Sequence, residues 1–114
     1  GTGTKQAAMT EKDTVQTAIL ACMANAGVGT LTKVGGTAVD PSAYQFIDTA
    51  ASISYMVGEN EVSYDLKTGP PALLTGTVQG AYAVTSSGAV VLAKYPSAVP
   101  EFLWNPDGGW QPVT

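Results

Sequence analysis

The sequence predicts an α+β domain in which a long N-terminal helix packs on an antiparallel β-sheet. Three observations favour this class: apolar residues recur at helical spacing over residues 14–29, alternating segments follow from residue 53, and Gly- or Pro-containing turns separate them. The length of 114 residues is that of one domain. We therefore expect a single domain over 1–114, with a helix at about 5–26, sheet and loops at 28–95 and a C-terminal tail at 96–114.

The helix is predicted from Lys5 to Ala26, with residues 2–4 as its approach. Its apolar residues lie three and four positions apart, so they share one face for three turns. Gly27 stands where helices commonly end with a glycine. We expect this face to pack on the sheet; its members are Val15, Ala18, Ile19, Cys22, Met23 and Ala26.

Residues 30–34 are predicted to form a short edge strand, and residues 42–52 a turn of helix or a loop. Residues 53–57 and 62–66 both alternate between apolar and polar side chains. The Gly58-Glu59-Asn60-Glu61 segment between them has turn composition, so the two segments are predicted to form a hairpin.

A second hairpin is predicted from residues 77–85 and 89–95, joined by Ser86-Ser87-Gly88. Gly88 suits a turn position at positive φ. Tyr82 and Val84 are expected on the same face of the first strand, because side chains alternate along a strand.

The tail over 96–114 carries both tryptophans and several prolines. Proline is tolerated poorly in central strands, so we expect the tail to wrap over the sheet and cover apolar surface with Phe102, Leu103, Trp104 or Trp110. Trp104 and Trp110 are also candidates for a platform that stacks sugars, as in carbohydrate-binding modules. Aromatic residues usually serve cores first.

The charge inventory excludes several functional classes. The chain has five lysines, no arginine, no histidine and nine carboxylates, for a net charge of −4. Nucleic-acid binding needs clustered basic residues, and zinc, copper and Ser-His-Asp chemistry need imidazole or several thiols. We expect no cofactor, no metal and no catalysis. Only 12% of residues are charged, against about 25% in typical soluble domains, which favours a secreted or surface protein.

Cys22 is the one cysteine, so no intramolecular disulfide can form. Its place in the apolar face predicts a buried thiol that behaves as a small hydrophobe. The alternative interpretation is an intermolecular bridge or a reactive thiol.

Acidic residues cluster in sequence around the first predicted hairpin turn, at Glu59, Glu61 and Asp65. Paired carboxylates can act as general acid and base, and their oxygens can bind calcium. Their spacing matches no known motif, so we interpret them as a solvated turn, with an enzyme using Glu59 and Glu61 as an alternative. Asp107-Gly108-Gly109 is likewise predicted to be a turn rather than a calcium loop.

The segment QAAMTEKDTVQTAILACMANAGVGTLT, residues 6–32, resembles the exposed half of the long N-terminal helix of type IV pilins. The hairpin at 80–91 is similar to the last sheet hairpin of pilin headgroups. The matching helix residues are Ala7, Ala8, Thr10, Glu11, Val15, Gln16, Thr17, Ala18, Met23, Ala24, Asn25 and Gly27.

The prepilin-peptidase motif of that family, a glycine followed by Phe-Thr-Leu-Ile-Glu, does not occur in this sequence. The resemblance therefore implies that the chain is the exposed part of a longer subunit, cut near the helix midpoint beside residues 1–3. A C-terminal disulfide loop cannot form with one cysteine. Pseudopilins share the same plan, so the resemblance does not separate pilus from pseudopilus.

The resemblance implies a structural subunit that assembles with identical or related subunits. The filament would lie on the cell surface, and the full-length subunit would insert in the membrane before assembly through an apolar N-terminal segment. A free-standing β-rich adhesin or carbohydrate-binding module is the alternative. Small residues outside the packing face are the candidate subunit contacts: Ala7, Ala8, Thr14, Thr17, Ala21 and Ala24.

Overall fold

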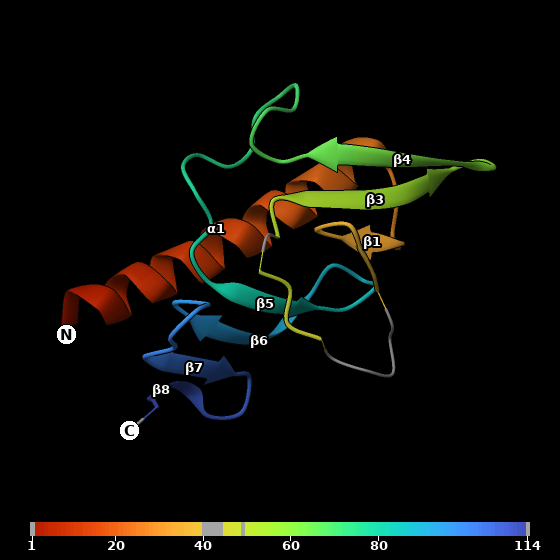
Figure 1. Cartoon of the computed structure of the whole chain (residues 1–114). Coiled ribbons are helices and arrows are strands. Elements are labelled where there is room, and N and C mark those ends of the chain that lie inside the picture. The colour runs from red at the N-terminus through yellow and green to blue at the C-terminus, as the bar shows by residue number, and fades with distance from the viewer. Residues whose placement is uncertain (1, 40–44, 49, 114) are drawn as a thin grey trace.

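The computed structural model describes residues 2–39, 45–48 and 50–113. In this part of the chain, one N-terminal helix is followed by two antiparallel sheets of four strands each (Figure 1). The predicted α+β class is confirmed. The sheet content is larger than predicted, because strands form in segments that were expected to be loop and tail.

Helix α1 runs over Thr2–Ala26. The prediction that residues 2–4 only approach the helix was wrong, since a single glycine costs about 1 kcal/mol in a helix and does not end it. At its other end the N–H of Gly27 (φ 70°) donates to the carbonyl of Ala24 at 3.2 Å, and the N–H of Val28 donates to Met23 at 3.0 Å. This pair of bonds is a Schellman motif, so the predicted glycine stop is confirmed.

The first sheet contains β1 (Lys33–Val34), β2 (Thr37–Ala38), β3 (Ser52–Val57) and β4 (Asn60–Asp65), in the order β2-β1-β3-β4. The predicted hairpin between β3 and β4 is confirmed, with Val57 opposite Asn60 across a two-residue turn.

Strand β1 lies between β2 and β3, so the prediction of an edge strand at 30–34 was wrong. Gly35 and Gly36 both have positive φ (59° and 79°) and join β1 to β2. Two consecutive residues at positive φ make the tight turn that best matches strand twist, which brings β2 alongside β1. Of the segment predicted at 42–52 as a turn of helix or a loop, residues 42–44 and 49 lie outside the described residues.

The second sheet is a meander of β5 (Ala81–Val84), β6 (Val90–Tyr95), β7 (Phe102–Asn105) and β8 (Gly109–Pro112). The hairpin between β5 and β6 confirms the second predicted hairpin. The tail, however, forms β7 and β8 instead of wrapping over the sheet. Its prolines permit this, because Pro106 lies in the turn and Pro112 ends an outer strand, where no further strand needs its N–H.

Helix α1 packs against both sheets. In Figure 1 it runs diagonally, with its C-terminal end behind β3 and β4 and with the β5–β8 sheet below it. One buried cluster joins helix residues such as Ile19 to Val34 and Ile53 of the first sheet and to Tyr82 and Val84 of the second. The helix and both sheets therefore share one core. It is not apolar enough to cross a membrane, and no other helix is present among the described residues.

Candidate functional site

The inner face of α1 carries the predicted packing residues. Val15, Ala18, Ile19, Cys22 and Met23 are buried, and Ala26 is half-buried against the same cluster. Two polar residues on this side of the helix, Glu11 and Gln16, are hydrogen-bonded to the second sheet.

Glu11 is the first of these polar anchors. Its carboxylate accepts hydrogen bonds from the N–H of Gln79 (2.9 Å), the N–H of Gly80 (2.8 Å) and the hydroxyl of Tyr82 (2.6 Å). Tyr82 is fully buried, and burial, together with its bond to Glu11, raises the pKa of its phenol. Hydrogen bonds to a charged acceptor are stronger than neutral ones, so Glu11 fastens the helix to the start of β5.

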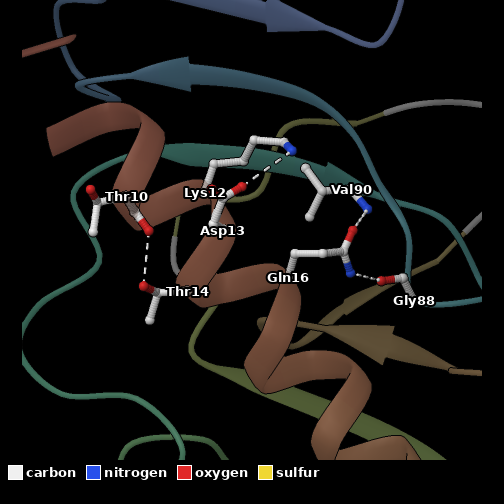
Figure 2. Close-up of polar contacts among 7 residues, drawn as sticks. All are labelled: Thr10, Lys12, Asp13, Thr14, Gln16, Gly88 and Val90. Atoms are coloured by element: carbon white, nitrogen blue, oxygen red, sulfur yellow. Dashed lines mark hydrogen bonds and ion pairs between the residues drawn. The ribbon is translucent and has the colours of Figure 1, made fainter. Parts of the chain in front are cut away.

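Gln16 anchors the turn between β5 and β6, as Figure 2 shows. Its side-chain amide donates to the carbonyl of Gly88 at 2.7 Å, and its amide oxygen accepts from the N–H of Val90 at 2.7 Å. The side chain thus pairs with the turn much as a neighbouring strand would, satisfying two backbone groups at once.

Lys12 provides a third contact with the second sheet. Its ammonium lies 3.8 Å from the centre of the Trp104 ring, a cation–π distance. Trp104 is paired with Trp110 across β7 and β8, and both are half-buried against the core. One ring face of Trp104 is therefore occupied by Lys12. The sugar-stacking platform of Trp104 and Trp110 stays a prediction.

The outer face of α1 carries the predicted contact residues. Ala7, Thr14, Thr17 and Ala24 are exposed and Ala21 is half-buried. Ala8 is buried, so it does not belong to this face. It lies two turns before Val15, and residues seven apart share a helix face.

Thr10 is exposed on the same side and was missed by the sequence prediction. With it, the residues of this outer side lie alternately three and four positions apart, the spacing of a helix–helix seam. Figure 2 shows Thr10 and Thr14 on the side of the helix away from Gln16. We call this set the outer stripe: Ala7, Thr10, Thr14, Thr17, Ala21 and Ala24.

The outer stripe borders a groove. Two adjoining hollows of about 400 and 540 Å³ share Thr10 and Thr14 as lining residues. The opposite wall comes from the connection between β4 and β5, at Leu73 in one hollow and over 74–78 in the other. Backbone bonds from Leu73 and Leu74 to the carbonyl of Leu66, at 2.7 and 2.8 Å, hold this wall in place.

Cys22 lies at the wall of a separate cavity of about 230 Å³, together with Tyr55 and Tyr64. Burial raises the pKa of the Cys22 thiol. A protonated thiol is a poor nucleophile, so the predicted role as a small buried hydrophobe agrees with its surroundings.

The acidic residues of the first hairpin have ordinary surface contacts. Glu59 is exposed in the turn, and Glu61 lies 3.2 Å from the ammonium of Lys33. Asp65 accepts bonds from the N–H groups of Lys67 and Thr68. Within 2–39, 45–48 and 50–113, no group of three or more acidic, Cys or His residues is arranged to hold a metal ion.

The turn between β7 and β8 is held in a similar way. The side-chain oxygen of Asn105 accepts bonds from the N–H groups of Asp107 (3.0 Å) and Gly108 (2.6 Å). The turn predicted at 107–109 is therefore present.

Comparison of the chain with protein-family models, with curated proteins and with solved structures finds no match. The resemblance of residues 6–32 to type IV pilins stays a prediction that rests on the sequence.

Proposed function

We propose that this domain is a structural subunit of a type IV pilus or a pilus-like filament and that it works by assembly rather than by catalysis. The observation that carries the proposal is the outer stripe of α1. Its side chains are no larger than threonine, they keep seam spacing from Ala7 to Ala24, and the domain's own sheets leave most of them uncovered.

Small residues on a helix let another helix approach closely, which strengthens van der Waals packing between the backbones. A helix that only covers its own core needs no such stripe on its outer side. The anchors at Glu11 and Gln16 fasten the inner side to the second sheet. Because these bonds fix the helix to the second sheet, the outer stripe keeps one position on the domain. This suits repeated docking of identical or related subunits.

The first turns of α1 extend beyond the ends of the strands in Figure 1. Lys5, Gln6 and Ala7 are exposed there. In the proposed filament, this end of the helix continues into an apolar segment that holds the subunit in the membrane before assembly. The filament then lies on the cell surface with this domain as its coat.

The test is a substitution in the full-length gene in the source cells. Thr17→Arg places a long charged side chain in the groove, where it blocks a second helix, and we expect filaments in the sheared surface fraction to be lost. Gln111→Arg, at an exposed position of β8, adds the same charge away from the stripe and is expected to leave filament yield unchanged.

Thermal unfolding of the isolated domain shows whether both variants fold. Because both sites are exposed, the melting temperatures are expected to stay close to that of the unmodified domain. Normal filaments from the Thr17→Arg gene would contradict assembly through the outer stripe.

A further inference from the structure

The outer edge of β4 is the longest open strand edge in the described part of the molecule. At the other end of the same sheet, β2 has only two residues. In the second sheet, β5 is bridged by Ile47 through bonds of 3.0 and 3.1 Å to Tyr82, and β8 ends in a proline. Strand β4 has six residues, contains neither glycine nor proline and pairs only with β3.

The hydrogen bonds of β3 show which groups of β4 face outward. The carbonyls of Ser52 and Ser54 accept bonds from Gly35 and Thr32, so these residues of β3 point their backbone toward β1. Because backbone direction alternates along a strand, the intervening residues Ile53 and Tyr55 point toward β4.

The register then fixes the direction of each residue in β4. Ile53 pairs with Tyr64, Tyr55 with Val62 and Val57 with Asn60. The backbone N–H and C=O groups of these three residues of β4 bond to β3. The same groups of Glu61, Ser63 and Asp65 face outward. The carbonyl of Asp65 accepts the N–H of Gly69. Among the described residues, the outward N–H and C=O groups of Glu61 and Ser63 have no hydrogen-bond partner.

The side chains beside this edge differ between its two faces. Glu61, Ser63 and Asp65 lie on one face, where the carboxylate of Glu61 also lies 3.2 Å from the ammonium of Lys33. Val62 lies on the other face and is partly exposed. An added strand would therefore meet carboxylates on one face and a valine on the other. Opposite charges directly across a strand pair are favourable and like charges unfavourable.

We propose that the outer edge of β4 binds an extended segment of a partner protein that alternates lysine or arginine with aliphatic residues. The segment adds a fifth strand to the first sheet, with its basic side chains over Glu61 and Asp65 and its aliphatic ones over Val62. Backbone bonds to Glu61 and Ser63 provide affinity, and the side chains provide selectivity. This inference is independent of the proposed filament function.

A second copy of this chain fits the edge less well. When two β4 strands pair antiparallel about Ser63, Glu61 of each copy lies opposite Asp65 of the other, so like charges face each other twice. The acidic face therefore favours a basic partner over self-association.

The test uses two synthetic peptides with capped ends, Lys-Val-Lys-Val-Lys-Val-Lys and its counterpart with Glu in place of Lys. Titration of the domain, followed by backbone amide NMR, is expected to show the basic peptide binding at least about tenfold more tightly. Hydrogen-exchange protection is expected to rise at the amides of Glu61 and Ser63. The amides of Val62 and Tyr64 are already bonded to β3 and are expected to change little.

Two variants separate backbone pairing from charge. Glu61→Ala removes one carboxylate and keeps the outward N–H, while Glu61→Pro removes both, so the proline variant is expected to bind at least about tenfold more weakly than the alanine variant. If the proline variant does not fold, the hydrogen-exchange protection of individual amides in the unmodified domain still tests the proposal.

Three results would overturn the proposal. They are equal binding of the two peptides, protection that appears away from Glu61 and Ser63, and a dimer of the chain alone in sedimentation velocity that Glu61→Pro abolishes.

Discussion

The carboxylate of Glu11 in the helix accepts a hydrogen bond of 2.6 Å from the hydroxyl of Tyr82 in β5, although the two residues are 71 positions apart. The same carboxylate accepts two backbone N–H groups from the residues just before that strand. One side chain therefore joins the helix to the second sheet and satisfies a buried phenol.

Glu11→Ala is expected to destabilise the domain by about 2–4 kcal/mol, because it leaves the buried Tyr82 hydroxyl and the Gly80 N–H without an acceptor. Urea unfolding followed by tryptophan fluorescence measures the free energy. Asp13→Ala removes an exposed carboxylate from the same helix, whose ion pair with Lys12 spans 3.8 Å, and is expected to cost less than about 0.5 kcal/mol. Equal costs for the two variants would contradict the role of Glu11 as an anchor.

The stability of the domain is expected to fall at alkaline pH. Burial, with the bond to Glu11, raises the pKa of Tyr82 above its ordinary value of 10.0. Below that pH the phenol is neutral in both states, so it adds no pH dependence. Above it the unfolded chain ionises first and binds fewer protons than the folded one, so the unfolding free energy falls by up to about 1.4 kcal/mol per pH unit for this group.

Urea unfolding between pH 8 and pH 11 measures this slope, and Tyr82→Phe is the control. Burial also raises the pKa of Tyr55 and Tyr95, which adds to the slope in the same direction. The Phe variant is expected to be less stable at neutral pH and to show a shallower decline. An unchanged slope in that variant would show that Tyr82 does not drive the alkaline loss.

Gln16→Ala is expected to cost about 1–2 kcal/mol, because it removes two hydrogen bonds to the turn between β5 and β6 and leaves the backbone of Gly88 and Val90 unpaired there. The neighbouring Thr17→Ala lies on the exposed outer stripe and is expected to change stability by less than about 0.5 kcal/mol. Thermal unfolding of both variants compares them, and a Gln16→Ala variant as stable as Thr17→Ala would refute the anchor.

Gly88 is required at its position for two reasons. Its φ is +85°, and a Cβ there would lie 2.5 Å from the Sδ of Met23. Gly88→Ala therefore combines backbone strain with overpacking, for an expected cost of about 2–4 kcal/mol. Gly36 has a similar φ of +79° with open space around it, so Gly36→Ala is expected to cost only about 1 kcal/mol. Chemical denaturation distinguishes the two; equal losses would mean that contact with the helix is unimportant.

The parts of the fold that the sequence predicted are those with local signals. The inner face of α1 follows from helical spacing, the helix stop from Gly27, and the two hairpins from alternating residues beside a turn. Each signal lies within a few positions of the element that it defines, so no tertiary information was needed.

The anchors could not be predicted in this way. Glu11 and Gln16 bond to groups 68–74 positions away, and in the sequence they look like any solvated residue on a helix. The strands of the tail were missed because proline was treated as excluding strands, whereas outer strands tolerate it. Thr10 had a usable signal, since it completes the three-and-four spacing between Ala7 and Thr14.

The outer stripe was predicted in part, because small residues are visible in the sequence. The groove beside it was not predictable, since its second wall comes from residues 73–78. That wall is placed by backbone bonds to Leu66 that no composition pattern indicates.

The central claim is that this domain belongs to a filament subunit that assembles through α1. The most direct measurement is the intact mass and N-terminal sequence of the native protein sheared from the surface of its source cells. The proposal predicts a mature protein with a methylated N-terminal residue and an apolar run of about 20 residues before Gly1. A native protein that begins near Gly1, with no apolar segment before it, would contradict the claim.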